Sequence, residues 1–163
     1  MNWWRRITGQ PELPDGFTGK LDGSERVLAS AATSDGGHLV VTSLGLWICE
    51  PAGDRRIGWH LVSTARWDGR MLHLVEADEI DTVGDAVLLT DRAPRRFRLP
   101  APGHVPELVR KRVTRSVLTS ERRDLAGGSA LFVRRQVPGR DGAQLQIRVD
   151  PGTDVDAVRR ALG

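Results

Sequence analysis

The amino-acid sequence predicts an α+β fold: an antiparallel, strongly bent sheet or open barrel closed by one long amphipathic helix, followed by a C-terminal hairpin and a short helix. Three observations lead to this prediction. Short segments of alternating polarity, separated by tight turns, fill residues 24–99. From residue 104 the apolar period lengthens to about 3.6 residues, which is typical of a helix. A second pair of alternating segments then flanks a turn at residues 138–142.

The first part of the chain contains about eight expected strands. Their connections are short, and tight turns such as Asp68-Gly69 join antiparallel neighbours, whereas parallel strands need a long crossover. Alternation supports the prediction, since Ile57, Trp59 and Leu61 fall on one face of their segment. The expected strands are residues 25–32, 38–42, 46–50, 56–62, 64–67, 71–76, 86–90 and 95–99.

The long helix is expected over residues 104–124. Pro106 would lie in its first turn, where a missing N–H does no harm, and Gly127-Gly128 would end it. A hairpin with strands at 130–137 and 144–149 should follow, and then a short helix over 153–162. The apolar side of the long helix would carry Val105, Leu108, Val109, Val113 and Val117.

Four short segments carry a resemblance to a known family. They are Glu25-Arg26-Val27-Leu28-Ala29, Arg56-Ile57-Gly58-Trp59, Ala65-Arg66-Trp67-Asp68 and Val113-Thr114-Arg115-Ser116. In this order they resemble an uncharacterised bacterial family with a pleckstrin-homology-like (PH-like) fold. The resemblance spans most of residues 24–124. It implies a bent sheet closed by a helix, and it implies no activity or ligand.

We expect three regions in one compact chain of 163 residues. Residues 1–20, with Trp3-Trp4-Arg5-Arg6 and then prolines and glycines, should form an N-terminal tail that is loosely ordered or folded back onto the domain. Residues 21–126 would form the PH-like domain. Residues 127–163 would form a hairpin-helix extension packed on the same domain.

The composition favours a cytoplasmic protein. There is no apolar run of about 18 residues to span a membrane, and the first residues lack the apolar stretch of a secretory signal. The single cysteine, Cys49, agrees with a reducing compartment, and its apolar neighbours indicate a small core residue rather than a nucleophile.

Charge is distributed unevenly along the chain. Up to Thr90 there are 8 basic and 13 acidic residues, and from Asp91 onward there are 16 basic and 8 acidic ones. Such asymmetry indicates a nucleic-acid, membrane or acidic-protein partner, or two surfaces of one fold that attract each other.

Recognisable catalytic and metal motifs are missing from the sequence. There is no P-loop, no Gly-x-Gly-x-x-Gly, no Gly-x-Ser-x-Gly, no paired Cys-x-x-Cys and no His-Glu-x-x-His. The four histidines have no paired spacing, and the acidic residues within 76–85 indicate a solvated loop rather than a calcium site. We therefore predict no enzymatic activity, no cofactor and no metal.

The basic second half provides the candidate binding surface. Lys111, Arg115 and Arg122 would form one outward stripe on the long helix, and Arg134 and Arg148 would share the polar side of the hairpin. We expect at least three of these five residues to share one exposed face. The alternative is an ordinary solvated surface. Arg112 stands out because it falls on the buried side of the helix, where it should either snorkel or pair with a buried acid.

The leading hypothesis is a non-enzymatic binding module for a protein or peptide partner. The alternative is a nucleic-acid-associated protein that contacts phosphates through the basic half. No aromatic residue interleaves with the basic set, although binders of single strands usually stack bases on aromatics. The sequence leaves the oligomeric state and the identity of the partner open.

Overall fold

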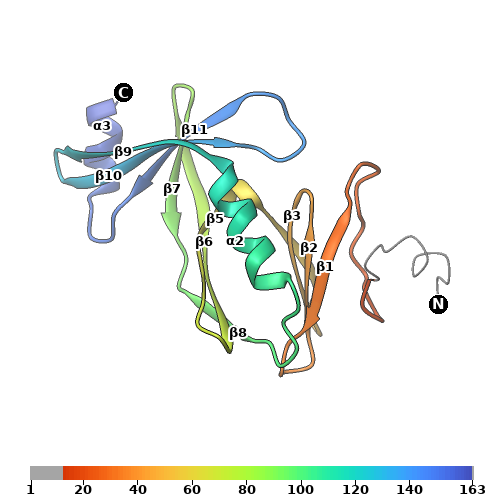
Figure 1. Cartoon of the computed structure of the whole chain (residues 1–163). Coiled ribbons are helices and arrows are strands. Elements are labelled where there is room, and N and C mark those ends of the chain that lie inside the picture. The colour runs from red at the N-terminus through yellow and green to blue at the C-terminus, as the bar shows by residue number, and fades with distance from the viewer. Residues whose placement is uncertain (1–12, 163) are drawn as a thin grey trace.

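The computed structural model describes residues 13–162 (Figure 1). These residues form eleven strands, two α-helices and one short 3-10 helix. The expected α+β class is confirmed: a strongly curled sheet lies beside a separate antiparallel sheet, with few helices. No helix in residues 13–162 is long and apolar enough to cross a membrane.

The first sheet is an antiparallel meander of four strands in chain order. The close spacing of the turns in the sequence predicts this arrangement, because short connections can only join antiparallel neighbours. At the β2–β3 turn, a Cβ at position 45 would lie 2.3 Å from the carbonyl oxygen of Ile57, so only glycine fits there. The strands are β1 (Val27–Ala32), β2 (His38–Thr42), β3 (Gly45–Glu50) and β4 (Gly53–Gly58).

The long strand β6 (Met71–Val83) connects the two parts of the molecule. Its first half pairs with β5 (Val62–Trp67) on one side and β8 (Arg95–Arg98) on the other. Its second half pairs with β7 (Ala86–Asp91) instead. Strand β6 therefore belongs over its whole length to the second, seven-stranded sheet, which contains β5 to β11, while the four-stranded meander is a separate sheet.

The acidic segment at residues 76–85, expected as a loop, is mostly this second half of β6, so that prediction is wrong. Acidic residues have low strand propensity, but pairing with the apolar strand β7 overrides it. The carboxylates of Asp78 and Asp81 keep part of their surface in solvent and meet arginines, whereas Glu76 is buried.

The C-terminal hairpin extends the second sheet. The strand β10 (Gly128–Gln136) pairs antiparallel with β9 (Val117–Leu125) on one side and with β11 (Ala143–Val149) on the other. Strand β11 then pairs in parallel with β7, so that the sheet runs β6-β7-β11-β10-β9. The helix α3 (Val155–Leu162) completes the chain and buries Val158 against this sheet.

The helix α2 (Val105–Ser116) is shorter than expected. The prediction of a helix to residue 124 is wrong, because Val117 adopts an extended conformation and begins β9. The hydroxyl of Ser116 donates to the carbonyl of Val113, and the following β-branched and polar residues gain a full set of pairings with β10. Tertiary pairing therefore outweighs the continuing helical period.

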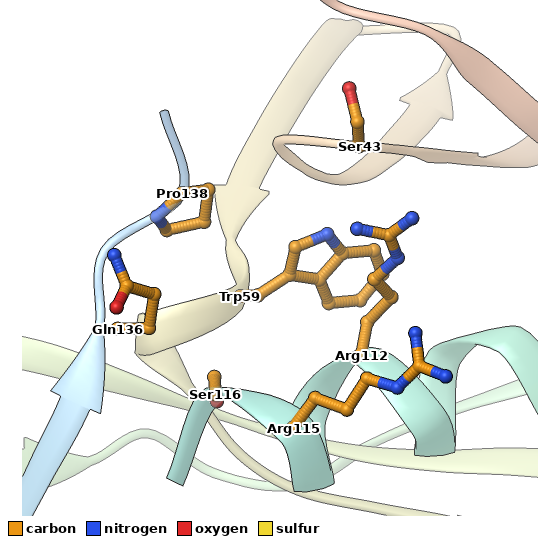
Figure 2. A pocket seen from close by; sticks show the side chains of 7 residues that line it. All are labelled: Ser43, Trp59, Arg112, Arg115, Ser116, Gln136 and Pro138. Atoms are coloured by element: carbon orange, nitrogen blue, oxygen red, sulfur yellow. The ribbon is translucent and has the colours of Figure 1, made fainter. Parts of the chain in front are cut away.

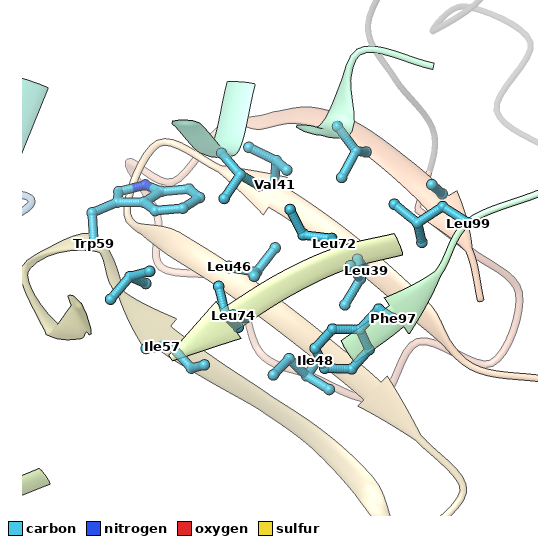
Figure 3. Close-up of a cluster of buried hydrophobic side chains, with 14 residues drawn as sticks. Leu39, Val41, Leu46, Ile48, Ile57, Trp59, Leu72, Leu74, Phe97 and Leu99 are labelled. Carbon is cyan, nitrogen blue, oxygen red and sulfur yellow. The ribbon is translucent and has the colours of Figure 1, made fainter. Parts of the chain in front are cut away.

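The main hydrophobic core lies between the first sheet, the strands β5, β6 and β8 of the second sheet, and the helix α2 (Figure 3). Trp59 is 2% exposed, and its indole N–H donates to the carbonyl of Thr42 at 3.0 Å. Trp47 is also buried, and Trp67 is partly buried. All three tryptophans fall on strands expected from the sequence, which predicts that each is at least half buried, and this prediction is confirmed. Figure 3 labels Leu39, Val41, Leu46, Ile48, Ile57, Trp59, Leu72, Leu74, Phe97 and Leu99 of this core.

The described part of the expected N-terminal tail packs onto the outer face of the first sheet. Phe17 meets Trp47 edge to face, with ring centroids 5.3 Å apart, and Asp54 accepts hydrogen bonds from the backbone of Thr18 and Gly19. This portion is folded back onto the domain. The Trp3-Trp4-Arg5-Arg6 segment lies outside the described residues.

Replacement of Trp59 tests the arrangement of the main core. Trp59→Ala should lower the free energy of unfolding by roughly 3–5 kcal/mol, because it empties a large buried volume. Trp67→Ala should cost less, since Trp67 keeps part of its surface in solvent. Thermal and urea unfolding would measure both. An unchanged melt for Trp59→Ala would contradict the burial of this side chain.

Candidate functional site

A buried arginine on β10 organises the region where the two sheets and α2 meet. Arg135 is 1% exposed. Its Nη1 donates to the carbonyl of Val62 and its Nη2 to the carbonyl of Trp59, each at 2.7 Å. Its Nε lies 2.9 Å from the hydroxyl oxygen of Ser116. Burial, together with the charge of Arg148, lowers the pKa of Arg135 to about 9.

These bonds fix the end of α2. The last carbonyls of a helix have no partner within the helix, and a cationic side chain is a favourable one. Arg135 contacts both Ser116 and the carbonyl of Val113, so it holds the helix end against the short 3-10 helix η1 (Trp59–Leu61). The position of the neighbouring cleft depends on this contact.

The cleft is a shallow depression of about 120 Å³ beside the indole of Trp59. Figure 2 shows the long side chains of Arg112 and Arg115 rising from α2 on one side of it, with Pro138 and Gln136 on the opposite side. Its lining residues are Ser43, Trp59, Arg112, Arg115, Ser116, Gln136 and Pro138.

The two arginines of the cleft have no acidic partner among the described residues. Burial lowers the pKa of the Arg112 guanidinium, and the nearby charges of Arg115 and Arg26 lower it further. Arg112 therefore reaches the surface without pairing with a buried acid, as the snorkelling alternative predicts. The result is a concentration of positive charge that nothing in residues 13–162 neutralises.

Two of the five predicted site residues share the exposed face of α2. Lys111 and Arg115 border a second, open depression on this helix. Lys111 pairs with Glu107 one helical turn earlier, with 3.1 Å between Nζ and the carboxylate, whereas Arg115 also borders the cleft. The structure thus brings Lys111 and Arg115 together.

The other three predicted site residues lie elsewhere. Arg122 is on β9 rather than on the helix stripe, and it pairs with Asp150. Arg134 is exposed on β10. Arg148 is mostly buried, donates to the hydroxyl of Ser63 and lies 3.8 Å from a carboxylate oxygen of Asp91.

The prediction that Arg134 and Arg148 share one side of the hairpin is wrong. In the observed register Arg134 lies opposite Leu145, and Arg148 lies opposite Leu131. Directly opposed residues of antiparallel strands point to the same face, so Arg134 and Arg148 point to opposite faces. The sequence pattern assumes a register that differs from the observed one by one residue, and such a shift exchanges the two faces of one strand.

Ion pairs between the acidic and basic halves account for part of the uneven charge. Asp81 on β6 meets Arg159 on α3, with 2.6 Å between carboxylate oxygen and Nε, and Glu50 meets Arg95 at 2.8 Å. Glu76 and Asp78 both contact Arg92. The two halves attract each other within one fold, which is one of the alternatives that the charge distribution predicts.

Sequence reasoning missed Trp59 as a wall of a site and did not place Arg112 in one. The sequence indicates Trp59 only as a core residue, because its place at the border of the cleft depends on where α2 ends. A signal for Arg112 was available: a cation on the apolar side of a helix has to reach either an acid or the surface.

Possible metal ligands and the cysteine thiol are the other reactive groups of the described residues. Within residues 13–162, no three His, Cys, Asp or Glu residues are arranged to hold a metal ion. Cys49 is buried, and burial raises the pKa of its thiol to about 12, as does the nearby charge of Asp54. A thiol with such a pKa is a poor nucleophile at neutral pH.

Comparison of the chain with protein-family models, with curated proteins and with solved structures gives no match. The case for a function therefore has to come from the geometry and charge of the cleft.

Replacement of Arg135 tests its role at the junction. Arg135→Met should lower the free energy of unfolding by about 2–4 kcal/mol, because the buried carbonyls of Trp59 and Val62 lose their hydrogen bonds from the guanidinium. Arg134→Met is the matched control and should change stability by no more than about 0.5 kcal/mol, since Arg134 is exposed. Equal unfolding free energies for the two variants would contradict the role of Arg135.

The histidine beside this junction should make stability depend on pH. Burial, reinforced by the charges of Arg135, Arg140 and Arg148, lowers the pKa of His60 to about 4. The unfolded chain binds this proton near pH 6.5, so the stabilisation is complete above pH 6.5 and is lost as the pH falls toward 4.

The free energy of unfolding of the wild type, measured with urea, should therefore fall between pH 6.5 and 4.5. The whole pKa shift limits this loss to about 3 kcal/mol. His60→Phe should flatten this part of the profile. A wild-type profile that is already flat in this window would contradict the lowered pKa of His60.

Proposed function

We propose that this chain is a non-enzymatic binding module for a protein or peptide partner, which it holds through the exposed face of α2 and the adjoining cleft. The observation that carries the proposal is the pair of unneutralised guanidiniums, Arg112 and Arg115, beside the indole of Trp59. Buried or clustered charge without a partner costs free energy and is common at binding sites.

Pairing elsewhere supports a local site rather than an extended one. Arg122, Arg92, Arg95 and Arg159 are each held by an acidic side chain of the same molecule. A nucleic-acid backbone needs a continuous basic track, and most of its affinity comes from several unpaired cations. The dispersal of this charge favours a protein partner over nucleic acid.

The PH-like architecture for residues 21–126 is part of the proposal. The four-stranded meander, the strands β5, β6 and β8, and a helix packed across them support this architecture. Two features depart from it: the helix ends at Ser116, and the second half of β6 leaves to pair with β7. We also propose a cytoplasmic location, which the buried, unpaired Cys49 supports.

Charge reversal on α2 tests the proposed function. Lys111→Glu with Arg115→Glu should abolish retention of the partner in affinity purification from a lysate of the source organism. Stability should change by no more than about 0.5 kcal/mol for each substitution, because both side chains are exposed. Arg96→Glu with Arg98→Glu gives the same change in net charge on β8 and should leave retention intact.

Nuclease treatment and salt separate the two classes of partner. Retention of a protein partner should survive nuclease treatment and should fall only modestly between about 50 and 200 mM salt. Over the same range of salt, a contact with six to ten phosphates loses about 10³–10⁵ in affinity. Loss of all retained material after nuclease would favour nucleic acid and contradict the proposal.

A further inference from the structure

The chemistry of the cleft beside Trp59 narrows the kind of group that can bind there. Three of its polar groups are already engaged. The indole N–H of Trp59 donates to Thr42, the hydroxyl of Ser116 is shared by Val113 and Arg135, and the hydroxyl of Ser43 accepts from the backbone of Arg26. The hydroxyl of Ser43 keeps its own O–H for a ligand, but the charged donors of the cleft are the guanidiniums of Arg112 and Arg115, so the group that the cleft favours is an anion.

The opposite wall of the cleft offers a hydrogen-bond acceptor. The amide nitrogen of Gln136 donates to the carbonyl of Arg140, at 2.6 Å, while its amide oxygen accepts no hydrogen bond from a described residue. That oxygen is an acceptor, so it suits a ligand that carries an N–H as well as an anionic group. A peptide has both. Inorganic phosphate can donate through O–H groups, but it has neither an N–H nor an apolar stem.

Size and apolar surface agree with this assignment. The cleft measures about 120 Å³, which is well below the roughly 300–1,000 Å³ of sites that enclose a whole small molecule or cofactor. The ring of Pro138 offers apolar surface to a short aliphatic stem, and the largely buried indole of Trp59 borders the same space. The cleft therefore fits the end of one side chain or of one peptide, not a nucleotide.

We propose that this cleft binds a peptide carboxylate: Arg112 and Arg115 hold the carboxylate oxygens, the indole of Trp59 and the ring of Pro138 cover its aliphatic stem, and Gln136 accepts a peptide N–H. The inference rests on the proposed function and names the group by which the partner is recognised. The carboxylate belongs either to an acidic side chain or to a free C-terminus, and guanidiniums pair with both in the same way.

Four probes test this assignment on the full chain. Two are carboxylates, acetyl-Ala-Ala-Glu-Ala-Ala-amide and acetyl-penta-alanine with a free C-terminus; acetyl-penta-alanine-amide and inorganic phosphate are the comparisons. Titrations followed by nitrogen–proton correlation spectra report on the indole N–H of Trp59 and the Nε–H groups of the two arginines. At least one carboxylate peptide should give saturable shifts of these signals, and the amide peptide should give none.

Substitutions place the binding in the cleft. Arg112→Gln and Arg115→Gln should each lower the affinity for the carboxylate peptide about tenfold, which is the loss expected for one charge-assisted hydrogen bond. Arg110→Gln removes the same charge from an exposed position of the same helix outside the cleft and should leave affinity within about twofold. Which of the two carboxylate peptides binds identifies the source of the group.

Three results would overturn the assignment: no saturable shift with either carboxylate peptide, an equal response to the amide peptide, or binding of phosphate alone. Equal weakening by Arg110→Gln would also overturn it, because the effect would then come from net charge. The proposed function fails separately, when the lysate experiment retains no protein or when charge reversal on α2 leaves retention unchanged.

Discussion

The guanidinium of Arg135 is the contact on which the arrangement of this molecule depends. It joins β10 to the carbonyls of Trp59 and Val62 and to the end of α2 at Ser116, although these elements are distant in the sequence. No carboxylate neutralises it among the described residues, so backbone dipoles compensate a buried charge. Such a charge is tolerable only while every one of these bonds is made, because each buried carbonyl left unpaired costs about as much as a hydrogen bond contributes.

This constraint produces the cleft. Arg135 holds the end of α2 beside η1, so Arg112 and Arg115 project next to Trp59, and the end of β10 and the turn after it bring Gln136 and Pro138 to the other side. Elsewhere some arginines of the basic second half are paired with the acidic first half, as Arg159 is with Asp81. In the cleft two guanidiniums lie close together beside an apolar wall, and such a local concentration of positive charge favours recognition of an anionic group.

The second sheet shows how local sequence preference gives way to pairing. The acidic half of β6 has poor strand propensity, and residues 117–125 continue a helical pattern, yet both are strands. In each case the partner strand is apolar and well formed, so the backbone hydrogen bonds and the buried side chains of the partner outweigh a propensity difference of a few tenths of a kcal/mol per residue.

The sequence by itself determined the α+β class, the meander, the start of α2, the final hairpin and the burial of Trp59, because these depend on local periodicity and turn residues. Only the tertiary structure decided where α2 ends, which face of the hairpin Arg134 and Arg148 occupy, and which arginines remain unpaired. The physical reason is that strand register and ion pairing are set by residues distant in sequence. A shift of one residue exchanges the two faces of a strand, and Arg112 belongs to a site only because Ser43, Trp59 and Pro138 are brought to it.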